Sequence, residues 1–415
     1  MQSFDILLCL ESLFERSINE VSKITTFTDT DLSLFETVDK AANELLLDEF
    51  ENYIERKFNS QAIEVLKKHD LIGIPIKKEY GGRGARPIVS TLCSERLGQV
   101  GLGGNSSVGV SIGLAGTCLE IWGTDDLKEK YLKPAATGDK ILAYALTEPD
   151  AGSDPTSISS TFEEVDGNYV LNGTKYLITN GSICDAVVVF AYPKGDNNMS
   201  AFIVDKNSEG FDVSMELKEK LGFFTSDTAL LEFDNVVIPK ENVIGIPGKG
   251  LWVAYTALIS GRMGVATGCV GVIEDCLNSV IERASTREQH GKLIGKHQLI
   301  QKHIADIAMS LEMAKWPTYI CALKVEDWEK DPLNRDLRLD VDQSSSIAKR
   351  ISSKLAFESA DKAVQVFGGF GYSILSPVGR HFLDTRATRI YEGTDEIMDL
   401  KIASGVLGKD FEAYK

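Results

Sequence analysis

The stretch Tyr169-Val-Leu-Asn-Gly-Thr-Lys-Tyr-Leu-Ile178 interrupts a long helical pattern and therefore decides the fold class. Its two halves, residues 169–171 and 175–178, are rich in the aromatic and β-branched residues that favour strands. Similar runs occupy residues 186–191 and 229–233, and Asp-Gly, Asn-Gly and Pro-Lys pairs between the runs predict turns. A β-domain is therefore expected between about residues 141 and 243.

Helical periodicity precedes this region. Between residues 29 and about 130, apolar side chains recur at spacings of three and four, as on one face of a helix. The first of them are Leu32, Phe35, Val38, Ala42, Leu45 and Leu46. Glycines at Gly73 and Gly81-Gly82 predict turns between helices.

Longer helical segments follow the β-rich region, over residues 254–285, 297–325 and 343–367. They predict a bundle of four helices. The chain is therefore expected to be of the α+β class. We expect an N-terminal extension (residues 1–28), an N-terminal α-helical domain (29–138), a middle β-sandwich or barrel-like domain (139–250) and a C-terminal four-helix bundle (251–415).

Composition excludes several classes of function. The 415 residues carry a formal net charge of −17, which argues against a nucleic-acid partner, because such a protein needs a basic surface. The seven cysteines are scattered and form no CxxC pair, so neither a disulfide framework nor a zinc or other metal site is predicted.

The N-terminus contains a short apolar run at residues 6–10. Asp5, Glu11 and Glu15 surround it where a signal peptide would be basic, so the run does not predict export. A cytoplasmic protein is expected. The sequence also suggests no apolar stretch of about 18 residues, and so no membrane span.

The segment Thr147-Glu-Pro-Asp-Ala-Gly-Ser-Asp154 is the first candidate site. Its hydroxyl groups, at Thr147 and Ser153, lie beside Pro149 and Gly152, which favour a tight loop with exposed backbone donors. Such a loop can hold the polar edge of a ring. Taken alone, this segment is explained equally well as a ring-binding loop and as an ordinary connection between a strand and a loop.

Five strings in one order favour the functional interpretation. They are Thr147–Asp154; Asn172-Gly-Thr-Lys175 with Ile178-Thr-Asn-Gly181; Leu231-Glu-Phe-Asp-Asn-Val-Val-Ile-Pro239; Arg287, Gly291 and His297-Gln298 with Gln365-Val-Phe-Gly-Gly-Phe-Gly371; and Ile390-Tyr-Glu-Gly-Thr-Asp-Glu-Ile397. In sequence and spacing the chain resembles the acyl-CoA dehydrogenase family from about Asp29 to its C-terminus.

The resemblance implies FAD as cofactor, bound between the β-domain and the bundle and partly across a subunit boundary, in a homotetramer. It implies flavin contacts at the β-domain and diphosphate contacts from a neighbouring subunit. The implied cofactor-binding residues are Tyr144, Leu146, Thr147, Gly152, Ser153, Leu177, Thr179, Arg287, His290, Gln298, Gln365, Gly368, Gly369, Thr394 and Glu396.

The resemblance places the catalytic base at Glu392. The α-proton of a thioester is very weakly acidic, so its removal requires a carboxylate close to the α-carbon and donors to the thioester carbonyl. The β-hydrogen then leaves as hydride to flavin N5. Burial should raise the pKa of Glu392, and the implied substrate contacts are Ser153, Arg262 and Gly393.

Some members of the family carry their base just before an arginine that corresponds to Arg262, but this chain has Gly261 there. The glycine at this position strengthens the assignment of Glu392 as the base, and it is expected to leave room for substrate. Arg262 itself is equally well explained as one half of a structural ion pair. The chain also departs from the common family pattern at Leu177, His290 and Asp399.

The substrate stays open at this stage. Leu97, Val100, Leu102 or Tyr372 could close the acyl cavity, and short or branched chains are favoured. An electron-transfer flavoprotein is the expected partner. The alternatives are a dehydrogenase or oxidase of carrier-bound or non-thioester substrates, and a flavin-binding interaction protein without catalysis.

Overall fold

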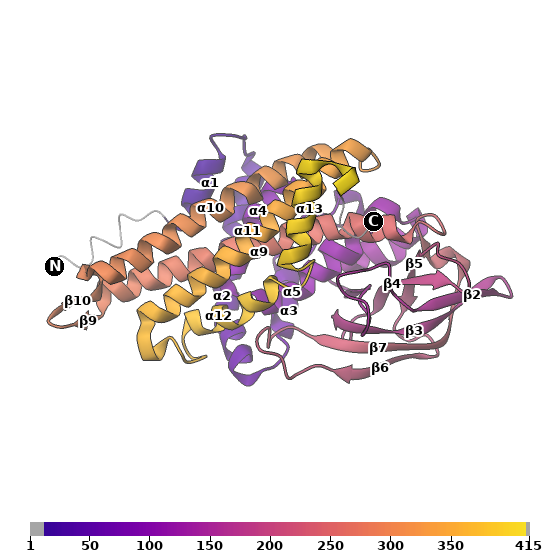
Figure 1. Cartoon of the computed structure of the whole chain (residues 1–415), viewed down its shortest axis with the longest axis horizontal. Coiled ribbons are helices and arrows are strands. Elements are labelled where there is room, and N and C mark those ends of the chain that lie inside the picture. The colour runs from indigo at the N-terminus through magenta and orange to yellow at the C-terminus, as the bar shows by residue number, and fades with distance from the viewer. Residues whose placement is uncertain (1–11, 412–415) are drawn as a thin grey trace.

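The computed structural model describes residues 12–411, so the apolar run at 6–10 lies outside the described part. Within it, α-helices and one large sheet occur in the order helix, sheet, helix (Figure 1). The sheet lies at one end of an elongated molecule, and the long helices extend away from it. The predicted α+β class, with a sheet between two helical regions, is confirmed.

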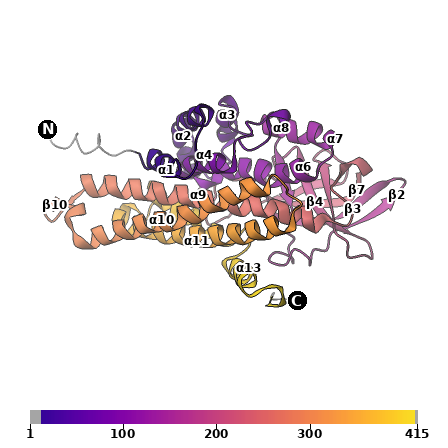
Figure 2. The ribbon, with the colours of Figure 1, turned by 90° about the horizontal axis from the view of Figure 1, so that it is seen from above.

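The helices before the sheet pack on one side of the long bundle (Figure 2). Phe35, Val38 and Leu45 are buried, as predicted, whereas Leu32 and Leu46 are about half exposed and do not belong to the packed face. The elements are α1 (Leu13–Val21), α2 (Asp29–Glu55), α3 (Ser60–Lys68), α4 (Pro87–Val100), α5 (Leu102–Val108), the π-helical η2 (Gly109–Gly116), α6 (Thr117–Trp122), α7 (Asp125–Leu127), η3 (Lys128–Leu132) and α8 (Lys133–Ala136).

Eight strands form a continuous sheet in the order β6-β7-β3-β2-β4-β5-β8, with β1 beside β4. The pairings of β4 with β1 and β2 are parallel, and the others are antiparallel. The strands are β1 (Leu142–Ala145), β2 (Thr161–Val165), β3 (Asn168–Thr179), β4 (Ala186–Pro193), β5 (Ser200–Asp205), β6 (Phe211–Glu216), β7 (Thr228–Ile238) and β8 (Val243–Ile244).

The predicted turn at Asn172-Gly173 is wrong. β3 runs through this pair without a break, and only its register to β7 shifts there. The reason is a close approach, because a Cβ atom at residue 173 would lie 2.5 Å from Cβ of Ser160. Gly173 therefore serves strand packing, which a dipeptide rule for turns does not detect.

Three long helices and one shorter helix form the bundle: α9 (Gly250–Thr286), α10 (Gln298–Trp328), α11 (Arg335–Phe367) and the 12-residue α12 (Pro377–Thr388). A short β-hairpin of β9 (Glu288–Gln289) and β10 (Lys292–Leu293) joins α9 to α10 at the tip farthest from the sheet (Figure 1). The last helix, α13 (Asp395–Leu407), packs on α11 and projects from the side of the bundle (Figure 2).

Helix α9 passes a length and composition test for a membrane span, contrary to the expectation from sequence. Its most apolar 18-residue window has a mean hydropathy of 1.4, and 61% of that window is buried inside the protein. The helix packs against α4, α10 and α11. Packing within the protein therefore accounts for much of its apolar character.

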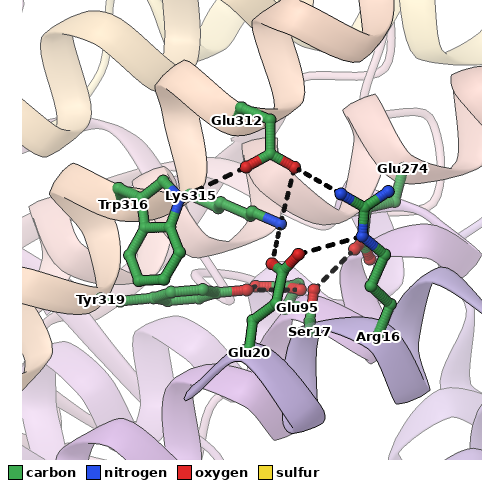
Figure 3. A network of polar contacts seen from close by, with 9 residues as sticks. All are labelled: Arg16, Ser17, Glu20, Glu95, Glu274, Glu312, Lys315, Trp316 and Tyr319. Carbon is green, nitrogen blue, oxygen red and sulfur yellow. Dashed lines mark hydrogen bonds and ion pairs between the residues drawn. The ribbon is translucent and has the colours of Figure 1, made fainter. Parts of the chain in front are cut away.

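Helix α1 lies in the predicted extension and is fastened to the bundle by both apolar and polar contacts. Phe14 and Val21 are buried, and a capping box between Ser12 and Glu15 begins the helix. Figure 3 shows the polar network beneath it. Lys315 of α10 binds Glu20, and its Nζ lies 2.9 Å from Oε1 of Glu312.

Two fully buried carboxyl groups, Glu95 of α4 and Glu274 of α9, form the floor of this network (Figure 3). The hydroxyl of Tyr319 donates to Glu95 at 2.8 Å, and that of Ser17 donates to Glu274 at 3.1 Å. Burial raises the pKa of Glu95 well above its ordinary range and also raises the pKa of Glu274. One proton between two such groups avoids a buried pair of like charges.

We expect this carboxyl pair to make stability depend on pH. A carboxyl group with a raised folded pKa holds its proton in the folded state after the unfolded chain has lost it, so stability falls as pH rises above the ordinary glutamate pKa. Replacing Glu274 by Gln should lessen the fall in Tm between pH 6 and pH 9 by about 2–4 °C. Thermal denaturation at both pH values measures this, with exposed Glu64→Gln as control. Equal falls in wild type and Glu274→Gln would contradict the assignment.

Candidate functional site

Glu392 and Gly393 form a left-handed turn between α12 and α13. Their φ angles are 56° and 93°, and the first is unusual for a residue with a side chain. Thr394 then caps α13, since its hydroxyl accepts from the backbone N–H of Ile397 at 3.3 Å. Such strained conformations persist only where surrounding structure holds them.

Two buried cations of the bundle hold this turn by its carbonyl groups. Nε of Arg262, from α9, donates to the Glu392 carbonyl at 3.4 Å, and Nζ of Lys349, from α11, donates to the Gly393 carbonyl at 2.6 Å. Arg262 also pairs with Asp342 at 2.5 Å. The structure thus places Arg262 in the structural ion pair considered from sequence, and at the turn as well.

The carboxyl group of Glu392 lies against Gly261. A Cβ atom at residue 261 would be 2.5 Å from Oε2 of Glu392 and 2.7 Å from a methyl group of Leu114. The space expected to be left for substrate beside Gly261 is therefore taken by the glutamate itself. Only glycine fits at this position without displacing the carboxyl group.

Oε2 of Glu392 is buried and makes no hydrogen bond to any described residue. Burial raises the pKa of the carboxyl group to about 7, although Arg262 and Lys349 nearby oppose the shift. An unpartnered buried carboxyl group with this pKa can accept a proton near neutral pH.

A second group of predicted residues lies where the sheet meets the bundle. Tyr144 is in β1 and its hydroxyl donates to the Ala254 carbonyl of α9 at 3.4 Å. Leu146 and Thr147 follow β1, and the Thr147 carbonyl accepts from the N–H of Tyr176 at 2.9 Å. Leu177 and Thr179, in β3, are therefore adjacent to them, whereas Gly152 and Ser153 are exposed on the loop that follows.

Leu177 presents an apolar side chain at this junction. It has a φ of 58° at a bulge of β3, and its side chain is 49% exposed. An exposed leucine in a left-handed conformation is uncommon and suits a wall for a flat apolar group.

The loop after β1 is anchored by a buried ion pair that sequence reasoning missed. Nζ of Lys175 lies 2.8 Å from Oε1 of Glu148, and both side chains are almost fully buried. The backbone and hydroxyl groups of Ser159 and Ser160 also donate to Glu148. Lys175 shares a strand face with buried Leu171, and a charged residue at such a position was the available signal.

Removing Lys175 should be costly. Lys175→Met would leave Glu148 charged and buried, so we expect the free energy of unfolding to fall by about 3–5 kcal/mol. Urea denaturation measures the loss. The matched control is Lys194→Met, because the pair of Lys194 with Glu163 is exposed and should contribute less than about 1 kcal/mol. Similar losses in both variants would refute the anchoring role.

The remaining predicted residues lie elsewhere. Arg287 ends α9 and His290 occupies the β9–β10 turn, and both are at the tip of the bundle (Figure 1). Gln298 begins α10, and Gln365, Gly368 and Gly369 lie at the end of α11. There, Cζ of Arg283 in α9 lies 5.4 Å from the ring centroid of Phe367. Along α9, Arg287 is roughly 40 Å from Gly261. One protomer therefore does not bring this distal group to Glu392.

Three acyl-CoA dehydrogenase family descriptions match the chain in succession: the N-terminal domain over residues 28–139, the middle domain over 143–236 and the C-terminal domain over 248–407. The chain belongs to the acyl-CoA dehydrogenase family. It is therefore an oxidoreductase, as predicted.

Known members resemble the chain over most of its length. The caffeyl-CoA reductase-Etf complex subunit CarC of Acetobacterium woodii is 38% identical over 370 residues, covering 88% of this chain and 93% of that protein. Butyryl-CoA dehydrogenase from Megasphaera elsdenii has a TM-score of 0.86 at 32% identity, covering 92% of this chain and 100% of its own. The FAD complex of PigA has a TM-score of 0.83 at 27% identity, covering 92% and 98%.

FAD is the cofactor of this acyl-CoA dehydrogenase family member. The residues present fit it. Leu177 offers an apolar wall, and Thr147 and Ser153 offer hydroxyl groups. No atom of residues 12–411 lies within 4 Å of a Cβ built at Gly368 or Gly369, so a diphosphate could approach the backbone there. Glu396 is exposed in the first turn of α13, where it is available to a bound partner or cofactor.

The other departures from the common family pattern lie away from Glu392. Asp399 pairs with Arg350 at 2.8 Å and so helps to fix α13 on α11. The ring of His290 lies 6.2 Å from that of His297, within the hairpin region.

Proposed function

We propose that this protein oxidises an acyl-CoA thioester between its α- and β-carbons, with Glu392 as the base that removes the α-proton. The observation that carries the proposal is the buried, unpartnered Oε2 of Glu392 beside Gly261. A carboxyl group that serves only structure would have a partner, since an unpaired buried polar atom is costly.

The turn geometry supports the same role. The N–H groups of Tyr391 and Asp395 donate to the Ala387 and Arg389 carbonyls, whereas the N–H of Glu392 makes no hydrogen bond to any residue that the structure describes. It is therefore free to donate to a thioester carbonyl and to stabilise the enolate that develops there. Bound FAD supplies the oxidant that accepts the β-hydrogen as hydride. Arg262 and Lys349 hold the base in place through the turn carbonyls.

Replacing the base tests the proposal directly. In Glu392→Gln, bleaching of the flavin by butyryl-CoA under anaerobic conditions should slow by about 10²–10⁴-fold with FAD still bound. In the wild type the rate should rise with pH through about 7, because the ionised carboxylate is the active form. Exposed Glu64→Gln should behave as wild type. Unchanged bleaching in Glu392→Gln would overturn the role of this residue.

We further propose a homotetramer in which each FAD lies between two protomers. Support comes from the separation of the two groups of cofactor residues along α9, since the distal group needs a ligand from another chain. The distal set combines the guanidinium of Arg287, which suits a diphosphate, with the open backbone of Gly368 and Gly369.

Co-expression of two inactive variants distinguishes an FAD site formed by two protomers from a site formed within one protomer. We expect Arg287→Ala to bind FAD poorly and Glu392→Gln to bind it without turnover. Oligomers that carry both affinity tags should regain roughly a quarter to a half of wild-type activity, because one of the two sites in each mixed pair combines an intact Glu392 with an intact Arg287. Mixed oligomers without activity would show that both residues serve the same protomer's site.

We also infer that electrons pass to an electron-transfer flavoprotein in the cytoplasm. The CarC relative carries the name of such a complex. All six described cysteines are buried and free, which is consistent with a reducing compartment.

A further inference from the structure

Helix α1 precedes the part of the chain that the family descriptions match, since the match to the N-terminal domain begins at residue 28. It has nine residues, a length at which an isolated helix is marginal in water, so its contacts with the rest of the protein hold it in place. Phe14 and Val21 provide apolar contacts, and Ser17 and Glu20 reach the polar network below (Figure 3). A change in that network can therefore release α1 as a unit.

The hydroxyl of Ser17 lies against both buried carboxyl groups. It donates to Oε1 of Glu274 at 3.1 Å and is also within hydrogen-bonding reach of Glu95. The two carboxyl groups are within hydrogen-bonding reach of each other as well. A hydroxyl has a single proton to donate, so it can bind one carboxylate and accept from a protonated carboxyl group, but it cannot donate to two carboxylates. The contact with α1 therefore requires one proton on the acid pair.

The nearby cations are already paired with other acids. Lys315 binds Glu20 and lies 2.9 Å from Oε1 of Glu312. Arg16 binds the same two glutamates, at 3.0 Å and 3.3 Å. The ionisable groups that face the acid pair are Arg16 and Glu20 of α1, Arg96 of α4, which pairs with Asp39, and Glu312, Lys315 and Tyr319 of α10. Loss of the shared proton would thus leave a second negative charge in a closed site, which is costly.

We propose that α1 is a latch operated by one proton: it stays closed over α4, α9 and α10 while Glu95 and Glu274 share the proton, and it opens when the proton is lost. The pair holds its proton more tightly in the closed state than in an open, solvated state, so the closed state loses stability as pH rises above the ordinary glutamate pKa. The raised pKa values of both groups agree with this direction. Along α9, Glu274 is roughly 20 Å from Gly261, so the inference does not depend on the proposed function.

Hydrogen-deuterium exchange of the FAD-bound protein, followed by mass spectrometry, tests the latch. The protection factor of the α1 amides should fall by about tenfold or more between pH 6 and pH 8, since the loss of one proton changes an equilibrium by up to about tenfold per pH unit. At pH 8 it should lie at least about 100-fold below that of β4, because α1 opens locally while the sheet stays folded. Protection of α1 that is the same at both pH values, or equal to that of β4, would overturn the latch.

Two variants supply the shared proton permanently. Glu274→Gln and Glu95→Gln each place an amide donor in the pair, so α1 should keep its protection between pH 6 and pH 8 within about threefold. If one variant does not fold, the other decides. The matched control is Glu312→Gln, because this acid of the same network is 42% exposed and binds Lys315 instead, so it should keep the wild-type fall. A fall that persists in the amide variants would refute the shared proton.

Discussion

The contact between the Glu392 carboxyl group and Gly261 is the constraint on which the site depends. A side chain at residue 261 would occupy the place of Oε2, so the base can lie here only because α9 carries glycine there. The glutamate reaches that place through a left-handed turn, a conformation that costs of order 1–3 kcal/mol. Long helices that pack along their whole length can offset such a cost at one loop.

The charges around the turn and the burial of Glu392 oppose each other, so the pKa of this carboxyl group lies near neutral pH. Burial raises the pKa of Glu392 to about 7, while Arg262 and Lys349 pull it down. Arg262 is largely compensated by Asp342, which also binds Lys401 at 3.0 Å. Lys349 is itself buried, and burial lowers its pKa to about 8. Without Asp342, an uncompensated guanidinium would hold Glu392 ionised at a lower pH and make it a weaker base.

Local periodicity was sufficient to predict the order of helices and strands, because period is a local property. Glu392, Gly261 and Arg262 were brought together by family resemblance, and the structure places these three residues side by side. The contacts of Lys349 and Lys175 could not be predicted in the same way. Each joins elements far apart in the chain, and the partner of a buried lysine depends on packing that no local spacing encodes.

Local sequence patterns also could not place the distal cofactor residues relative to Glu392. Arg287 and Gly368 were associated with FAD only through family resemblance, and their separation from Glu392 within one chain follows from the length of α9. Helix length is readable from sequence, whereas the arrangement of protomers is not.

Two sets of buried acids in this protein show why a raised pKa alone does not mark a catalytic residue. Glu95 and Glu274 have raised pKa values, yet Tyr319, Gln99 and Ser17 provide their hydrogen bonds, so they serve the packing of α1, α4, α9 and α10. Glu392 has a raised pKa and, among the described residues, no partner for Oε2, which lies against Gly261. The missing partner is the informative difference, because folding has left one costly polar atom unsatisfied where a substrate can satisfy it.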